Sequence, residues 1–137
     1  MVYAWDKNLE TGNEIIDRQH KQLFEMLNNL IIAHQEARGP VELDAALKFM
    51  TEYTVRHFED EEALQIKYRY PNYEEHKNQH NHFKFVIKDL VQQLVEEGYS
   101  KHMVEKTIRI IASWLITHIK GDDLELAKHI RKIDLQE

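Results

Sequence analysis

The stretch Asp17–Ile31, DRQHKQLFEMLNNLI, decides the fold class of this 137-residue chain. Its apolar residues recur at spacings of three and four, which is the period of an amphipathic α-helix. They are Leu23, Phe24, Leu27, Leu30 and Ile31. Three further segments repeat this period, and they are separated by breaks at Gly39-Pro40, Tyr70-Pro71 and Gly98. With 4 glycines and 2 prolines the chain lacks the turn residues of an all-β domain, so long helices are expected.

We predict one all-α domain over residues 1–137. Short turns between long helices make sequence neighbours pack antiparallel. The expected fold is therefore an up-down-up-down antiparallel four-helix bundle with an N-terminal arm and a short C-terminal helix. The arm is expected at residues 1–16 and the short helix at residues 123–132, and the four long helices at residues 17–38, 41–68, 71–97 and 100–120.

Composition excludes several classes of protein. The 18 Lys and Arg against 24 Asp and Glu give a net charge of -6, which disfavours a nucleic-acid partner because phosphate attraction needs a concentrated positive face. The absence of cysteine excludes disulfides, thiolate metal sites and cysteine nucleophiles. No stretch reaches the ~20 apolar residues of a membrane span, and the N-terminal residues lack the basic start and apolar run of a signal peptide. We therefore expect a soluble, cytoplasmic protein that does not insert into membranes.

Nine histidines in a cysteine-free chain call for a search for imidazole metal sites. In the predicted bundle, the start of the first helix, the end of the second, the start of the third and the end of the fourth share one end of the molecule. Seven residues of metal-binding type fall at that end: His20, His57, Glu61, His76, His80, His118 and Asp123. The other four histidines, His34, His82, His102 and His129, are expected to be solvated.

Burying five imidazoles and two carboxylates without partners would cost several kcal/mol for each ion, and a metal centre removes that cost. Seven ligands exceed the four of a tetrahedral zinc site. They suit two metal ions that share two bridging carboxylates. Imidazole with carboxylate suits iron, and also manganese, cobalt or zinc.

The order H…HxxxE…HxxxH…HxxxxD resembles the hemerythrins, in particular the free-standing bacterial kind. The resemblance covers essentially the whole chain. The segments that carry it stand in family order: IIDRQH (Ile15–His20), HFEDEE (His57–Glu62), YPNYEEHKNQH (Tyr70–His80) and WLITHIKGDD (Trp114–Asp123).

The resemblance implies a centre of two iron ions joined by an oxo or hydroxo bridge. His76, His80 and His118 would hold one iron, and His20 and His57 the other, which keeps an open position. Glu61 and Asp123 would bridge both ions. The implied function is reversible binding of O2 as a peroxo species at the open iron, for oxygen carriage, storage or delivery, with no catalytic residue. The implied O2 pocket consists of Leu23, Phe58, Trp114, Leu115 and Ile119, for each of which ordinary core packing is an equally good interpretation.

Two positions depart from a simple pattern. His118 and Asp123 are five residues apart, which on an ideal helix places them about 140° apart. The helix is therefore expected to distort or end near Gly121, and Asp122 is the one nearby rival to Asp123. Gln65 stands where relatives often carry methionine or another apolar residue, and we expect it at the rim of the pocket.

Three other functions fit the same seven residues. The first is a di-iron enzyme that acts on peroxide, nitric oxide or ferrous iron. The second is an oxygen or redox sensing module that passes its signal to a protein partner, and an oxygen carrier would equally need a protein acceptor. The third is a structural bundle filled with zinc. The pattern leaves the oligomeric state open.

Overall fold

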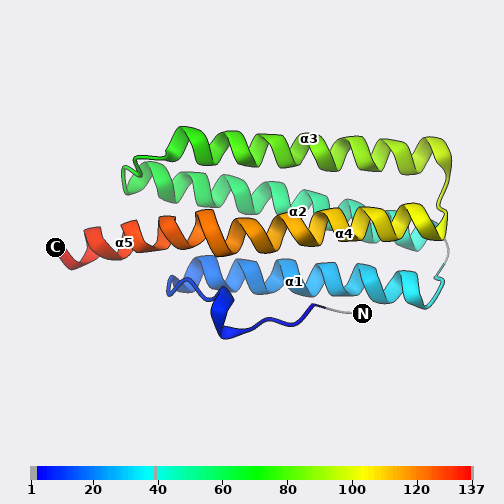
Figure 1. Cartoon of the computed structure of the whole chain (residues 1–137), viewed down its shortest axis with the longest axis horizontal. Helices are drawn as coiled ribbons and strands as arrows, with labels where there is room; N and C mark the ends of the chain where they lie inside the picture. The colour runs from blue at the N-terminus through cyan, green and yellow to red at the C-terminus, as the bar shows by residue number, and fades with distance from the viewer. Residues whose placement is uncertain (1–2, 39, 137) are drawn as a thin grey trace.

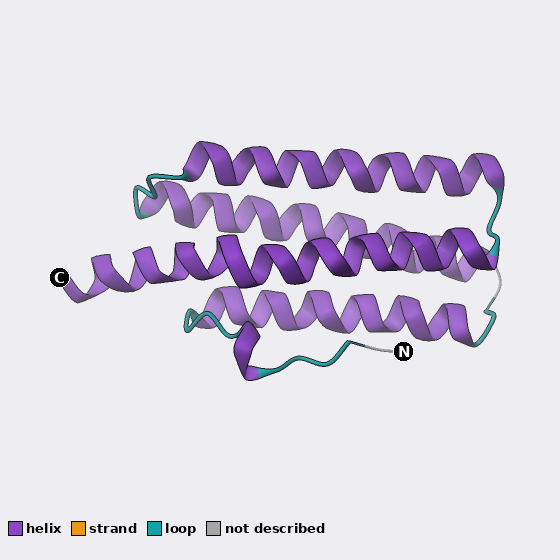
Figure 2. Cartoon of the chain, in the orientation of Figure 1, coloured by secondary structure: helices purple, strands orange, loops and turns teal. Residues whose placement is uncertain are grey.

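Four long helices run antiparallel to their sequence neighbours, as Figure 1 shows. They are α1 (Glu14–Gln35), α2 (Pro40–Lys67), α3 (Tyr73–Glu97) and α4 (Lys101–His118). The structure is a computed structural model that describes residues 3–38 and 40–136. Met1 and Val2 of the predicted arm, Gly39 of the predicted break and Glu137 lie outside the described residues. Every regular element of the described residues is helical (Figure 2), so the predicted all-α bundle is confirmed.

Local capping explains where the helices begin and end. The side chain of Asn13 accepts a hydrogen bond from the Ile16 N–H at 3.0 Å, so α1 begins at Glu14 rather than at the predicted residue 17. It ends at Gln35 rather than 38, since Ala37 has a φ of 52°. Ser100 caps α4 in the same way, accepting from the Met103 N–H at 3.1 Å.

The turns between the other helices also shift the predicted bounds by a few residues. Arg69 has a φ of 52° in the turn after α2, and α3 begins at Tyr73 rather than at the predicted residue 71. Gly98 ends α3 with a φ of 87°, a conformation that glycine adopts without steric cost. These short turns hold the four helices in their up-down-up-down order.

The fourth helix does not end where the sequence predicts. It passes into a five-residue π-helix, η2 (Ile119–Asp123), and then into α5 (Leu124–Gln136). Figure 1 shows α4 and α5 as one rod that reaches past the end of the bundle. The predicted distortion near Gly121 is thus a widened turn with i to i+5 hydrogen bonding. The C-terminal helix extends to Gln136, beyond the predicted residue 132.

The apolar stripes of the four helices meet in one core along the bundle axis. Buried residues at its centre include Leu27, Met50, Phe83 and Ile111. A smaller cluster of Ile16, Tyr70, Leu126 and Ile130 closes the end where α5 leaves the bundle. Between this cluster and the main core lies the level of the seven predicted ligands. Within the described ranges, no helix is both long and apolar enough to cross a bilayer.

The N-terminal arm lies along α1 (Figure 1) and is hydrogen-bonded to α1 and α5. It contains the short 3-10 helix η1 (Lys7–Leu9). The Asp17 carboxylate accepts hydrogen bonds from the Thr11 N–H and hydroxyl, both at 2.8 Å, and from the Gly12 N–H at 3.1 Å. Arg131 Nη2, on α5, donates to the Thr11 carbonyl at 2.9 Å. The arm therefore joins α1 to α5 beside the predicted metal level.

Candidate metal centre

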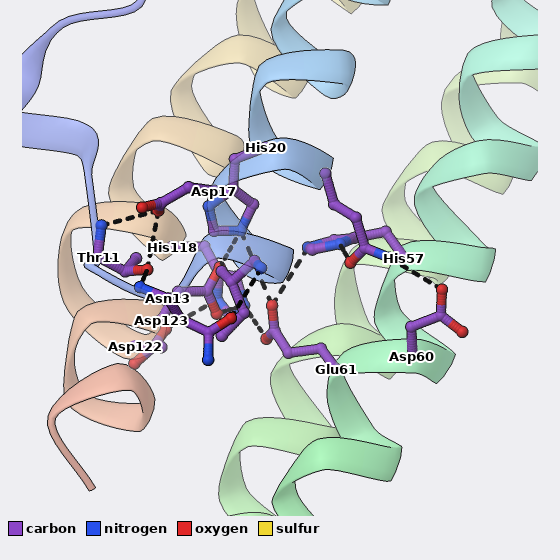
Figure 3. Close-up of polar contacts among 12 residues, drawn as sticks. Thr11, Asn13, Asp17, His20, His57, Asp60, Glu61, His118, Asp122 and Asp123 are labelled. Atoms are coloured by element: carbon purple, nitrogen blue, oxygen red, sulfur yellow. Dashed lines mark hydrogen bonds and ion pairs between the residues drawn. The ribbon is translucent and has the colours of Figure 1, made fainter. Parts of the chain in front are cut away.

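The structure brings all seven predicted ligands together at one level of the bundle. His20 comes from α1, His57 and Glu61 from α2, and His76 and His80 from α3, while His118 ends α4 and Asp123 ends η2. No side chain among them is more than slightly exposed, and the largest exposed fraction is 4%. Figure 3 shows His20, His57, Glu61, His118 and Asp123 pointing toward one another.

Three imidazoles form the first half of the cluster. His118 Nε2 lies 2.9 Å from His76 Nε2 and 2.9 Å from His80 Nε2. Imidazole nitrogens at ~2.1 Å from one metal ion and at right angles to each other are about 3.0 Å apart. The three nitrogens therefore have the spacing of neighbouring ligands on a single ion.

Two imidazoles form the second half, on the side of α1 and α2. The rings of His20 and His57 lie edge to face with their centroids 4.9 Å apart. His20 Nε2 is 2.8 Å from Asp123 Oδ2, and His57 Nε2 is 3.2 Å from Glu61 Oε2.

Each of the two carboxylates faces both halves. Glu61 Oε1 lies 2.9 Å from His76 Nε2, and Asp123 Oδ1 lies 3.0 Å from the same atom. Their second oxygens face His57 and His20. The ligand atoms thus form a five-donor group (Glu61, His76, His80, His118 and Asp123) and a four-donor group (His20, His57, Glu61 and Asp123) that share both carboxylates.

The widened turn η2 explains how two consecutive acidic residues both reach His118. Asp122 Oδ2 accepts a hydrogen bond from His118 Nδ1 at 2.9 Å, while Asp123 Oδ1 lies 3.2 Å from His118 Nε2. On a regular helix residues i+4 and i+5 point about 100° apart. The π-turn brings both to one histidine, and it places Asp123 rather than Asp122 in the cluster.

The buried cluster has donor atoms to spare, which is the expected condition of a metal site. Both oxygens of Glu61 and of Asp123 and both ring nitrogens of His20 lack a partner with hydrogen-bond geometry within the described residues. Buried polar groups are nearly always satisfied, so this concentration of free lone pairs needs an explanation. A set of imidazoles and carboxylates with no thiolate fits iron.

Comparison with known proteins identifies the family. A profile of the Hemerythrin HHE cation binding domain matches residues 11–130. The chain belongs to the hemerythrin family.

A bacteriohemerythrin of Stenotrophomonas maltophilia (strain R551-3) is 29% identical over 130 residues, covering 95% of this chain and 82% of the relative. A hemerythrin-like protein of Naegleria gruberi is 32% identical over 123 residues, covering 90% of this chain and 89% of the relative. The crystal structure of a wild-type hemerythrin superposes with a TM-score of 0.79 at 26% identity, covering 93% of this chain and 97% of that one.

In this member of the hemerythrin family, three histidines of the cluster each hydrogen-bond through Nδ1 to an outer partner. His80 Nδ1 donates to Glu62 Oε2 at 2.9 Å, as His118 does to Asp122. His57 Nδ1 donates to Gln19 Oε1 at 2.8 Å, and Gln19 Nε2 donates in turn to Asp60 Oδ2 at 2.9 Å. A proton fixed on Nδ1 leaves the Nε2 lone pair for a metal ion.

Sequence reasoning missed all three of these outer partners. Gln19 and Glu62 each stand next to a predicted ligand in the chain, but their histidine partners lie on another helix, so no sequence spacing reveals the pairing. Asp122 was considered only as a rival to Asp123, although its i+4 spacing from His118, which brings two side chains together on a helix, could have revealed the pairing.

Electrostatics couple the cluster tightly. Burial disfavours charge on His20 and His76, but the adjacent carboxylates of Asp123 and Glu61 outweigh it and raise the pKa of each imidazole to about 9. The pKa of His118 is raised well above its ordinary value by the same carboxylates and Asp122. Conversely, the surrounding imidazoles overcome burial and lower the pKa of Glu61 and of Asp123. In the metal-free protein, protons therefore occupy the cluster.

Of the five predicted pocket residues, Phe58 and Trp114 contact histidines of the cluster, and the other three are buried in two apolar clusters. Leu23 and Leu115 are fully buried in the main core. Phe58 stacks on His80 with ring centroids 3.9 Å apart, and Trp114 stacks on His118 at 4.4 Å. Ile119 packs under the arm with Leu9 and Phe24.

Three expectations about polar residues near the core are wrong. Gln65 is not at a rim: its exposed fraction is 0%, and neither amide atom has a hydrogen-bond partner in the described part of the chain. His34 and His129 are half-buried rather than solvated. His34 lies 3.7 Å from Glu105, and His129 Nε2 donates to the Tyr68 carbonyl at 2.7 Å. His82 and His102 are exposed as predicted.

Proposed function

We propose that the chain is a di-iron protein that binds O2 reversibly, for oxygen carriage, storage or delivery. The observation that carries this proposal is the sharing of Glu61 and Asp123, each of which turns one oxygen to the five-donor group and the other to the four-donor group. Two carboxylates shared in this way suit two ions held side by side. The likeness to bacteriohemerythrins supports iron as the metal.

The unequal donor groups suggest where O2 binds. His76, His80 and His118 with the two carboxylates supply five donors, whereas His20 and His57 with the same carboxylates supply four. For an ion that takes six ligands, the five-donor group would nearly complete the coordination, whereas the four-donor group would leave more room for O2. When bound, the two irons would supply two electrons to O2 and take them back on its release.

The chain's own residues favour reversible binding over oxidation of a substrate. Five neutral imidazoles bring less negative charge than the four Glu and two His of carboxylate-rich di-iron proteins. Fewer anionic ligands disfavour high-valent iron and cleavage of the O–O bond. The buried side chains of Leu23, Leu115 and Ile119 exclude water from the neighbourhood of the cluster, which slows protonation and loss of reduced oxygen.

Anaerobic purification from iron-replete cells tests the proposal. We expect two irons per chain and an absorption band that develops in air and disappears under argon. One ion per chain, or tightly bound zinc with no iron, would exclude the di-iron centre. Multiple turnovers of peroxide or nitric oxide would assign an enzymatic function instead. The cytoplasmic location and the lack of a nucleic-acid partner stay predictions.

A further inference from the structure

In the five-donor group, two of the three imidazoles hydrogen-bond outward to a carboxylate. His80 Nδ1 donates to Glu62 Oε2 at 2.9 Å. His118 Nδ1 donates to Asp122 Oδ2, also at 2.9 Å. The negative charge of a carboxylate draws the Nδ1 proton away from the ring, which makes the imidazole a stronger electron donor to a metal ion. The outer partners of this group therefore favour the more highly charged state of an iron ion.

The four-donor group has no outer carboxylate of this kind within the described residues. His57 Nδ1 donates at 2.8 Å to the side-chain oxygen of Gln19. The Nδ1 of His20 is buried without a hydrogen-bond partner in the described part of the chain. An amide carries no charge, so neither imidazole of this group receives the electron density that a carboxylate supplies.

The Asp60 carboxylate fixes the orientation of the Gln19 amide. A carboxylate only accepts hydrogen bonds, so the amide turns its NH2 group to Asp60, and Gln19 Nε2 lies 2.9 Å from Asp60 Oδ2. The amide oxygen then faces His57, which must donate from Nδ1 and keeps the lone pair on Nε2. Asp60 is exposed, so water also screens its charge. Gln19 thus holds the nearest outer negative charge one side chain away from the imidazole.

We propose that Gln19 is a positioning residue whose neutral amide keeps the iron of the four-donor group easier to reduce than its neighbour and so speeds the release of O2. The inference rests on the proposed function, since it takes the two donor groups to hold iron. Two Fe(II) ions give one electron each to O2 when it binds, and the same two electrons return when O2 leaves. A more strongly donating ligand stabilises Fe(III). A neutral partner at His57 therefore favours the return of the electrons and the loss of O2.

Exchanging the charges of Gln19 and Asp60 tests the proposal. In Q19E/D60N the new carboxylate accepts from His57 Nδ1 and from the new amide, so the hydrogen bonds, the side-chain lengths and the net charge are all kept. Only the negative charge moves, one side chain closer to His57. The matched control Q92E/E96Q makes the same exchange in an exposed pair at the far end of α3, where Gln92 Nε2 donates to Glu96 Oε1 at 3.1 Å.

The iron-loaded proteins give two readouts. We expect Q19E/D60N to release O2 roughly tenfold more slowly than wild type, measured by mixing the oxygenated protein with an oxygen scavenger. A tenfold change corresponds to ~59 mV for one electron. The midpoint reduction potential, titrated under argon, should therefore fall by about that amount, and Q92E/E96Q should match wild type in both measurements.

Binding of Co(II) under argon gives a readout that requires neither iron nor O2. Each chain should bind two Co(II) ions, and the weaker of the two affinities should rise roughly tenfold in Q19E/D60N, since an anionic partner makes His57 a better ligand. If Gln19 had only a structural role, the exchange would leave this affinity unchanged or lower it. E62Q makes the opposite change, because it gives His80 a neutral partner. It should lower the stronger Co(II) affinity and raise the reduction potential.

Equal release rates and equal potentials in Q19E/D60N and Q92E/E96Q would overturn the proposal. Faster release of O2 or weaker Co(II) binding by a Q19E/D60N protein with normal circular dichroism would overturn it as well. If Q19E/D60N does not fold, E62Q decides, and an unchanged potential in that variant would overturn the rule that the charge of the outer partner sets the potential.

The same measurements separate this proposal from the proposed function. A wild-type chain that holds two irons but shows no air-dependent band would overturn the O2 function, and the potentials and Co(II) affinities would still decide whether Gln19 sets the potential. A wild-type chain that binds no divalent metal would overturn both.

Discussion

At the scale of the single residue, the two donor groups should respond differently to the loss of a ligand. Replacing His57 by Ala leaves His20 as the remaining imidazole of the four-donor group. We expect the H57A variant to retain only the iron of the five-donor group and to lose the O2-linked absorption band. The fold should persist, because removal of a buried side chain typically costs ~2–5 kcal/mol.

Iron analysis, far-ultraviolet circular dichroism and spectra in air measure these properties on the purified variant. The matched control is His82→Ala, on the exposed face of α3, which should keep both irons and the band. Two irons with normal oxygenation in the His57 variant would show that His57 is not a ligand.

Leu115, one turn before His118, should protect the oxygenated protein from water. Leu115→Ala opens space next to the cluster, so we expect unchanged iron content but faster autoxidation, followed as loss of the air-dependent band with time. Ile111→Ala is the control, because Ile111 is equally buried one turn further from the cluster. Both variants lose comparable packing, so equal autoxidation rates would show that distance from the centre does not matter.

We expect Gln65 to lower the stability of the fold in the metal-free state. Its amide is fully buried without a hydrogen-bond partner among the described residues. Gln65→Met, which keeps the length of the side chain and removes the polar atoms, should raise the free energy of unfolding by about 1–2 kcal/mol. Urea unfolding of the metal-free protein measures the change, with exposed Gln92→Met as a control expected to have little effect. If Gln65→Met instead lowers the free energy of unfolding, the buried amide makes a stabilising hydrogen bond and the prediction is wrong.

At the scale of the element, the widened turn η2 does not depend on its glycine. Gly121 has no positive φ, and a Cβ placed there would meet nothing within 4 Å. Gly121→Ala should therefore raise the free energy of unfolding by about 0.5–1 kcal/mol, the usual gain for a helical glycine. Iron content should not change.

Deletion of Gly121 provides the contrast. Asp123 would then stand four residues after His118 and Asp122 three, so in a regular helical turn Asp123 would take the i+4 position that Asp122 now has and would leave the cluster. We expect this variant to remain helical and to bind less iron than Gly121→Ala. Full iron content after the deletion would show that the π-turn is not needed to assemble the centre.

The elements also show what sequence can predict. Each helix carries its own apolar stripe, and that local signal sufficed to predict four helices and to bring seven polar residues to one end. The exact first and last residues of the helices depend on the Asn13 cap and on the positive φ of Ala37 and Arg69. The spacing of apolar residues does not predict either feature. The pairing of His57 with Gln19 depends on the packing of α1 against α2. The burial of Gln65 was not predicted because a polar amide side chain is normally expected at the surface.

At the scale of the whole molecule, the metal-free protein should lose stability as the pH rises. The pKa of His20 and of His76 is about 9 in the fold, against ~6.5 in an unfolded chain. The fold therefore binds these protons more tightly, and the resulting stability is complete below pH ~6.5 and lost as the pH rises through about 9. At acid pH the lowered pKa values of Glu61 and Asp123 have the corresponding effect: their contribution to stability is lost as the pH falls below ~4 and the carboxylates take up protons.

Urea unfolding of the metal-free protein at several pH values between 6 and 10 measures this dependence. The iron-loaded protein is the control, because a metal-bound imidazole cannot take up the proton. A flat profile for the metal-free protein over this range would contradict the tight coupling within the cluster.

The position of Asp123 in the chain has a consequence for biosynthesis. A ribosome makes His20 early and Asp123 late, and both carboxylates must be present before either donor group is complete. The nascent chain can therefore form α1, α2 and α3 while it still lacks the segment that finishes the centre. Iron would therefore be bound only after all four long helices have been made, because Asp123 follows α4 in the chain.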